Sequence, residues 1–321
     1  MAVTTAEREN GILATRAEVM GSITQLHDKF RPVPQPLLTD DQVRSAIDQL
    51  HGGGAPPVSV LDAAARLGLL AVSVPSDFGG ADLPNDVIAE LLTATAGKSE
   101  AAATLLATHF VALELVRTSG TFEQRRGVYN RVILGERFRC PSLDLLEVDF
   151  HPDGIGLRLE PSASLPGGEG EDWTVLPVGD PAGKRGVILL SAAVSLGAAA
   201  PVPTEEGSPA AIHLPGDNFL VLGEEAQHLA KALSSLLKGA VLLGGLDHRA
   251  AEGQGSPGTP EAVGAATQSV FAELLSAMIA RLACMIDARQ VGANTVAAAD
   301  LSATIAAMEC LNVRVLRGDP V

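Results

Sequence analysis

The sequence predicts an α+β protein in which helices at both ends of the chain flank a small β region. Ala- and Leu-rich segments with helical spacing occupy roughly residues 60–136, short apolar runs separated by Gly, Pro and Asp follow, and long apolar helical segments return after residue 223. We therefore expect an N-terminal helical domain over residues 1–137, a middle β domain over 138–222 and a C-terminal helical bundle over 223–321.

In the N-terminal domain, apolar residues recur three and four positions apart, which places them on one face of each helix. The pattern predicts helices over residues 1–30, 39–50, 60–70, from about 84 onward, and 100–119. Between the third and fourth of these, Ala71–Val74 is expected to be a short extended run, because Pro75 disfavours helix at and before its own position. Gly79 and Gly80 predict a tight reversal that side chains would obstruct.

The middle region is predicted to form five or six short strands. The expected strands are Ile155–Leu159, Trp173–Val178, Gly186–Leu190, Ala210–Leu214 and Phe219–Leu222. The Gly-rich stretch Pro166–Glu171 lacks the strand-to-helix setting of a phosphate-binding loop, so we interpret it as a hairpin connection.

The C-terminal part predicts long helices over Glu224–Glu252, Pro260–Gln290 and Thr295–Leu316. Pairs of small residues, Gly239–Ala240 and Gly244–Gly245, would allow neighbouring helices to approach closely. These helices are too apolar to be solvated on all faces, so we expect them to mediate self-association.

Composition excludes several classes of function. The net charge is −15 and no basic cluster occurs, which argues against a nucleic-acid partner. The cysteines, Cys140, Cys284 and Cys310, are far apart and odd in number, so neither a disulfide framework nor a metal site is expected. The chain shows no signal-peptide pattern and no apolar run near 18 residues, so we expect a cytoplasmic protein without a membrane span.

Two stretches carry a resemblance to a known family. They are LGLLAVSVPSDFGGADL (Leu67–Leu83) and SGTFEQRRGVYNRVILGER (Ser119–Arg137), joined by an Ala/Leu-rich helix that contains His109. In this order they resemble the amino-terminal helical domain of the acyl-CoA dehydrogenase superfamily, which includes flavin-dependent monooxygenases. The resemblance implies a helical domain, a middle β domain and a C-terminal bundle, with FAD or reduced flavin as cofactor.

The flavin-binding segment of that family is not recognisable here. Members usually follow the Gly-Glu boundary with Thr-Glu-Pro and Gly-Ser-Asp, whereas Gly135–Glu136 is followed by RFRCPSLDLLEVDF. The Glu-Pro-Ser at Glu160–Ser162 is not followed by Gly-Ser-Asp. Trp173 is the candidate cofactor-binding residue because its ring could stack on a ligand; the other interpretation is a core or hairpin anchor.

The resemblance supplies no catalytic base. Dehydrogenases of the family use a Glu or Asp on a late loop, or on the first helix of the last domain, to remove a substrate proton. In that helix the stretch Lys231–Lys238 contains Ser234 and Ser235 but no acid. His109 is the candidate catalytic residue, with packing as the alternative, and Glu309 could reach a cavity but has no partner at a diagnostic spacing.

Two functions remain open from the sequence. One is a flavin-dependent oxidoreductase that either desaturates an acyl thioester or hydroxylates a small molecule with reduced flavin and oxygen. The other is a scaffold that has lost flavin and acts as a flavin-free biosynthetic enzyme or a non-catalytic subunit. In either case the resemblance implies a homo-oligomer, or a hetero-oligomer with a related subunit.

Overall fold

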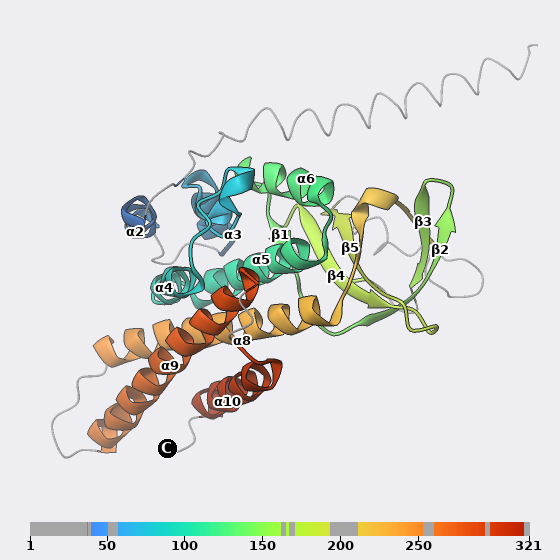
Figure 1. The fold of residues 1–321 in the computed structure, drawn as a ribbon. Helices are drawn as coiled ribbons and strands as arrows, with labels where there is room; N and C mark the ends of the chain where they lie inside the picture. Colours follow the sequence, from blue (N-terminus) through green and yellow to red (C-terminus); the bar gives the residue numbers. More distant parts are fainter. Residues whose placement is uncertain are drawn as a thin grey trace, which may run out of the picture.

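The structure is a computed structural model that describes residues 37, 40–50, 57–161, 165–166, 171–192, 211–252, 260–292 and 296–317. Helices from the two ends of the chain pack together into one layer of the molecule, and the sheet lies beside them (Figure 1). This arrangement confirms the predicted α+β class. The helix expected over residues 1–30 lies outside the described residues.

The N-terminal helices follow the predicted pattern closely. They are α2 (Asp40–Gln49), α3 (Pro57–Arg66), α4 (Asn85–Ala96), α5 (Glu100–Ser119) and α6 (Phe122–Ile133). Local signals fix their ends: the Ser99 hydroxyl accepts a hydrogen bond from the Ala102 N–H at the start of α5. At the start of α6, Thr121 and Gln124 form a reciprocal capping box, which satisfies two backbone donors.

The segment between α3 and α4 departs from the expectation in one place. Residues 71–74 are not extended, because a 3₁₀ turn, η1 (Leu69–Ala71), and further turn hydrogen bonds keep the chain coiled. This turn lets Leu69, Leu70, Val72 and Val74 all reach the core, where each is 1% exposed or less. A strand would have pointed alternate side chains to solvent.

The Gly79–Gly80 reversal is confirmed. Gly79 has a φ of 86°, in the left-handed region that favours glycine. A Cβ atom on Gly80 would lie 2.0 Å from the Val74 carbonyl oxygen, so any side chain there would collide with backbone. After the second 3₁₀ turn, η2 (Ser76–Phe78), the Asp82 N–H donates to the Val74 carbonyl and closes the turn.

The sheet is built from β1 (Phe138–Arg139), β2 (Leu146–Asp153), β3 (Gly156–Pro161), β4 (Trp173–Gly179), β5 (Arg185–Ser191), β6 (Ile212–Pro215) and β7 (Phe219–Val221). Its order is β6-β3-β2-β4-β5-β7, and β1 pairs with β4 in parallel. A short 3₁₀ turn, η3 (Gly216–Asn218), joins β6 to β7.

Two expectations about this sheet were wrong. Strands β1 and β2 were not predicted, since charged residues interrupt the apolar positions of β2. The connection from β3 to β4 is not a hairpin, because β2 lies between those two strands in the sheet. The chain therefore crosses over β2 before it re-enters the sheet.

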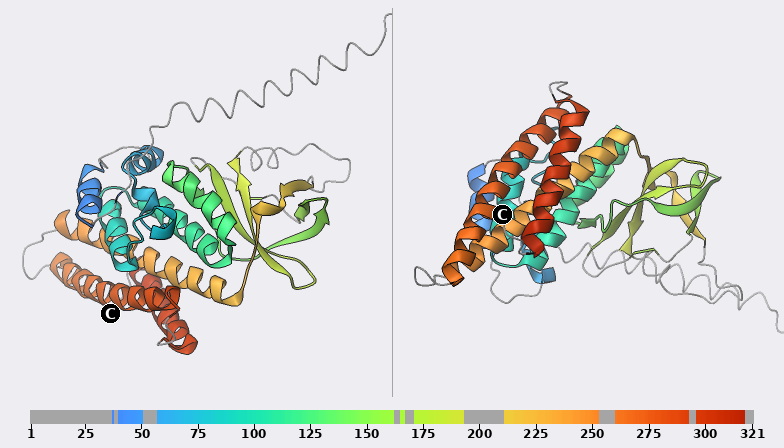
Figure 2. Two further views of the ribbon diagram at one scale, coloured as in Figure 1. Left: turned by 45° about the horizontal axis from the view of Figure 1, so that its top comes forward. Right: turned by 90° about the horizontal axis from the view of Figure 1, so that it is seen from below.

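The C-terminal helices are α8 (Glu224–Glu252), α9 (Pro260–Gln290) and α10 (Ala298–Arg317). Helix α8 lies at the centre, with α4 and α5 on one side and α9 and α10 on the other (Figure 2). The predicted close approach is confirmed, since the Thr93 hydroxyl donates to the Ala240 carbonyl, 3.1 Å away. A Cβ atom on Gly244 would lie 2.2 Å from the Thr93 carbonyl oxygen.

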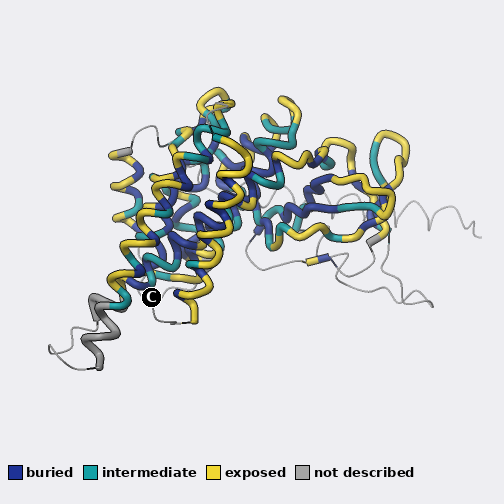
Figure 3. Tube along the Cα trace, turned by 60° about the horizontal axis from the view of Figure 1, so that its bottom comes forward, coloured by how far each residue is buried: buried dark blue, intermediate teal, exposed yellow. Residues whose placement is uncertain are grey.

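Buried segments concentrate inside the helical layer and along the sheet, and the outer turns are exposed (Figure 3). By length and composition alone, three helical stretches among the described residues could cross a membrane: Glu100–Ser119, Glu224–His248 and Thr267–Gln290. The first two are 67% buried inside the protein, so their apolar surface packs internally, whereas the third is 39% buried.

Candidate functional site

A cavity of about 630 Å³ lies where the three parts of the chain meet. Its walls come from the middle of α5, the loop between β1 and β2, and one face each of α8 and α10. This volume falls within the range of about 300–1,000 Å³ that is usual for small-molecule and cofactor sites. The lining is rich in hydroxyl and charged groups, so the cavity suits a polar ligand.

The loop Cys140–Asp144 forms one wall of the cavity. Within it the Ser142 hydroxyl donates to the Asp144 carboxylate, 3.0 Å away, and the Asp144 N–H donates to the same hydroxyl oxygen. Burial raises the pKa of the Cys140 thiol to about 12, and its S–H donates to the Ser142 carbonyl. Cys140 therefore stays protonated and is not a nucleophile.

Helices α8 and α10 meet across the cavity through a serine and a carboxylate. The Ser235 hydroxyl donates to Glu309 Oε1 at 3.2 Å, and the Asn312 side-chain amide donates to the Ser235 carbonyl at 3.1 Å. Glu309 therefore has a hydrogen-bond partner, Ser235, that no spacing in the sequence revealed. The signal was absent because the two residues are 74 positions apart and meet only when α10 packs on α8.

A second contact between α8 and α10 joins His228, near the start of α8, to Ser302. Ser302 donates its hydroxyl hydrogen to the Ala298 carbonyl, and its oxygen lies 3.0 Å from His228 Nε2. Because the serine hydrogen is already used, His228 Nε2 carries a hydrogen and donates it to Ser302. This contact holds the start of α10 against α8.

His109, the candidate catalytic residue, lies in the core and not on the cavity wall, although its neighbour Thr108 does line the cavity. Its Nδ1 accepts a hydrogen bond from the Phe138 N–H and its Nε2 donates to the Leu70 carbonyl, both at 3.1 Å. Burial lowers the pKa of His109 to about 4, so the ring is neutral. Both ring nitrogens bind backbone groups, which supports the packing alternative; a catalytic role stays a prediction.

Trp173, the candidate cofactor-binding residue, is half-buried and contacts three protein side chains. Its indole N–H donates to Glu136 Oε2 at 2.6 Å, and its ring stacks on Phe138 with centroids 5.9 Å apart. The Arg131 guanidinium lies 4.8 Å from the ring centroid. These contacts favour the anchor interpretation, in which Trp173 joins α6 to the first strand of the sheet.

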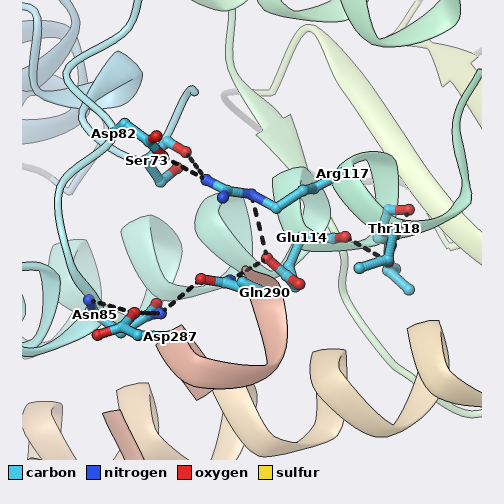
Figure 4. Close-up of polar contacts among 9 residues, drawn as sticks. Ser73, Asp82, Asn85, Glu114, Arg117, Thr118, Asp287 and Gln290 are labelled. Atoms are coloured by element: carbon cyan, nitrogen blue, oxygen red, sulfur yellow. Dashed lines mark hydrogen bonds and ion pairs between the residues drawn. The ribbon is translucent and has the colours of Figure 1, made fainter. Parts of the chain in front are cut away.

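A chain of polar side chains links α4, α5 and α9 (Figure 4). Asp287 accepts hydrogen bonds from the Asn85 N–H and side-chain amide, and so caps α4 from a distant helix. Gln290 accepts from the same Asn85 amide and donates to Glu114 Oε2 at 2.7 Å. Arg117 lies 3.7 Å from that carboxylate oxygen.

Glu114 is the ionisable centre of this chain of contacts. It is 3% exposed, and its second oxygen, Oε1, has no hydrogen-bond partner. Burial raises its pKa from the ordinary value of 4.5 to about 7, although Arg117 and the Gln290 hydrogen bond oppose the rise. Burial also raises the pKa of Asp287, against the effect of its hydrogen bonds from Asn85. No sequence pattern predicted this network.

The described part of the chain contains no group of three or more His, Cys, Asp or Glu side chains that could hold a metal ion. The three cysteines are free. The cavity between α5, α8 and α10 is the candidate site because of its size and its polar lining.

These features define a class: a helical domain, a small sheet and a C-terminal helical bundle, with a cofactor-sized cavity at their junction. The family model of the acyl-CoA dehydrogenase N-terminal domain matches residues 38–136. The sequence match thus covers the amino-terminal helices, and the chain as a whole has the acyl-CoA dehydrogenase fold, as its sequence resemblance predicted. No curated protein matches the chain by sequence.

Solved structures share this fold at low sequence identity. Methanesulfinate monooxygenase MsuC from Pseudomonas fluorescens is 16% identical, with a TM-score of 0.69 over 88% of this chain and 84% of its own. FMN-bound TdsC from Paenibacillus sp. A11-2 is 15% identical, with a TM-score of 0.62 over 86% and 82%. A nitroalkane oxidase is 12% identical, with a TM-score of 0.59 over 87% and 84%.

Proposed function

We propose that the protein is a flavin-dependent oxidoreductase that acts on an acyl thioester or another small metabolite in the cavity between α5, α8 and α10. The observation that carries the proposal is a cofactor-sized cavity that contains a positioned carboxylate, Glu309, hydrogen-bonded to Ser235. The family of the amino-terminal domain and a flavin-bound structural neighbour support it. The flavin-free alternative gains no support from these comparisons.

The residues present fit a flavin. The loop Cys140–Asp144 would hold it, because this loop lines the cavity and offers polar groups to the edge of a ring system. When bound, the flavin would supply the redox chemistry, either by accepting a hydride or by activating oxygen. We propose FAD or reduced flavin as its form.

Glu309 would serve as the proton acceptor. One carboxylate oxygen is fixed by the Ser235 hydroxyl, which leaves the other to take a proton from a substrate carbon or hydroxyl group. Ser235 is itself held in place, because its carbonyl accepts from Asn312 inside the bundle. A carboxylate held by a hydrogen bond between two packed helices has a restricted geometry, which favours proton transfer.

The first test is the visible absorption of the full chain after incubation with excess FAD or FMN and removal of free flavin. Flavin retained at about one per chain supports the proposal, and a protein that retains neither oxidised flavin nor, in an anaerobic repeat, reduced flavin rejects it. Turnover by Glu309→Gln would then be compared with turnover by Glu273→Gln, an identical exchange on the exposed face of α9. Loss of turnover with flavin binding intact in the first variant alone assigns the proton transfer to Glu309.

We also propose that the chain associates with a second copy of itself through α9 and α10. These helices carry large apolar side chains that are more than two-fifths exposed, namely Val270, Leu274, Val313 and Leu316. Light scattering of the eluted protein tests this: a mass near twice or four times 33.0 kDa is expected, and a monomer mass at micromolar concentration rejects it.

A further inference from the structure

Most hydrogen-bond donors on the cavity wall are already engaged within the protein. The hydroxyls of Thr104 and Thr108 donate to carbonyls of their own helix. Those of Ser142 and Ser235 donate to carboxylates, and that of Ser302 donates to a carbonyl. These groups keep little capacity to donate to a bound molecule.

Three donors form the exception: Lys231, Ser234 and Lys238, all from α8. Among the described residues, none of these side chains forms a hydrogen bond or ion pair, although all three line the cavity. The intervals of three and four residues place them on one face of the helix. The cavity therefore has one wall with two free positive charges and a free hydroxyl between them.

Positive charge is scarce in this protein, which makes its position informative. The chain has a net charge of −15 and only five lysines, and two of those five lie on this wall. Carboxylates in the same cavity are the expected ion-pair partners of these lysines. Here the two cavity carboxylates, Asp144 and Glu309, are instead bound by serine hydroxyls.

The spacing suits a single compact anion. Lys231 and Lys238 are seven residues apart, which corresponds to about 10 Å along the helix axis. Each lysine has a four-carbon stem, so both ammonium groups can approach a group held above Ser234. Phosphate and sulfonate oxygens accept charge-assisted hydrogen bonds from such groups.

We propose that Lys231, Ser234 and Lys238 form an oxyanion subsite that binds a phosphate or sulfonate group of the ligand in the cavity. This inference rests on the proposed function, since the group could belong either to a flavin phosphate or to an anionic substrate. Asp144 and Glu309 also face this cavity, and Glu309 is held against α8 by Ser235, so the two lysine charges have to offset these carboxylates where the anion binds.

The experiment measures binding of inorganic phosphate, methanesulfonate, riboflavin and FMN to the full chain by calorimetry at constant ionic strength. The variants are Lys231→Gln and Lys238→Gln, with Lys231→Arg to restore the charge. Lys184→Gln, an exposed lysine between β4 and β5, is the matched control. Far-UV melting curves confirm that each variant folds; both cavity lysines are exposed, so no loss of fold is expected.

We expect each Gln variant to bind phosphate and methanesulfonate about 10- to 100-fold more weakly, because it loses a hydrogen bond to a charged group. Lys184→Gln and Lys231→Arg should bind as the wild type does. If neither Gln variant differs from the Lys184 control, the subsite does not exist.

The two flavins identify the source of the anion. If FMN binding weakens in the Gln variants and riboflavin binding does not, the flavin phosphate occupies the subsite. If both flavins bind the variants normally, and phosphate binds flavin-loaded wild type but not the flavin-loaded variants, the substrate's anion occupies the subsite. If neither flavin binds the wild type but phosphate binding depends on the lysines, the subsite stands and the flavin-dependent function fails.

Discussion

Replacement of Glu114 by Gln tests whether the buried carboxyl group of α5 is protonated near neutral pH. In the native chain burial raises its pKa from 4.5 to about 7, so within that window the native protein holds a proton that the unfolded chain has released. The free energy of unfolding therefore falls as pH rises from about 4.5 to about 7. At about 1.4 kcal/mol per pH unit, the total loss is about 3 kcal/mol.

The measurement is urea unfolding of the wild type and Glu114→Gln at several pH values. Relative to the wild type, the variant should gain roughly 2–3 kcal/mol between about pH 5 and about pH 8. Glu273→Gln, exposed on α9, should show little change in the same comparison. The comparison with a variant is needed because His109, whose pKa burial lowers to about 4, gives the wild type an opposite dependence over much of this range.

A difference between Glu114→Gln and the wild type that stays constant over this pH range would refute the reasoning. It would show that Glu114 is ionised in the native state throughout, with Arg117 compensating for its burial. A difference that shrinks as pH rises would show that Arg117 pairing outweighs desolvation.

Three further substitutions test the fold. Gly80→Ala should lower the free energy of unfolding by about 3 kcal/mol or more, because its Cβ would lie 2.0 Å from the Val74 carbonyl oxygen; an unchanged urea midpoint would contradict that geometry. Thr121→Ala should cost about 1 kcal/mol by removing the capping box with Gln124, and a thermal midpoint equal to the wild type would argue against the cap. His109→Leu should cost about 2–5 kcal/mol in urea unfolding near pH 7, because two buried backbone groups lose their partners; a neutral effect would mean that water replaces the ring.

Helix positions could be predicted from the sequence because their signals are local. The expected bounds of α5, Glu100 and Ser119, agree with the structure, since a capping serine precedes the helix and a glycine follows it. The capping box of α6 was likewise readable as a sequence pattern. The fold class followed from the order of such segments.

The sheet was harder to predict, because strand β2 alternates buried Val148 and Phe150 with the charged residues Glu147 and Asp149. This is the period-two pattern of a half-exposed strand, but its low apolar content concealed it. The crossover between β3 and β4 depends on which strands pair, and no local signal specifies that.

The site itself depends on tertiary packing. The spacing of Lys231, Ser234 and Lys238 was visible in the sequence, but which face of α8 turns toward a cavity was not. The partnership of Ser235 with Glu309 joins two helices that local patterns treat separately. His109 was conspicuous as a helix histidine, yet only the structure shows that backbone groups occupy both its nitrogens.

The hydrogen bonds between α9 and the N-terminal helices have a consequence for synthesis of the chain. Asn85 binds Asp287, which follows it by 202 residues, and Glu114 binds Gln290, 176 residues later. At a translation rate of about 5–20 residues per second, 202 residues take roughly 10–40 s. During that interval the apolar faces of α4 and α5 have emerged from the ribosome without the helices that cover them. We therefore expect the nascent protein to depend on chaperones until α8 and α9 have been made.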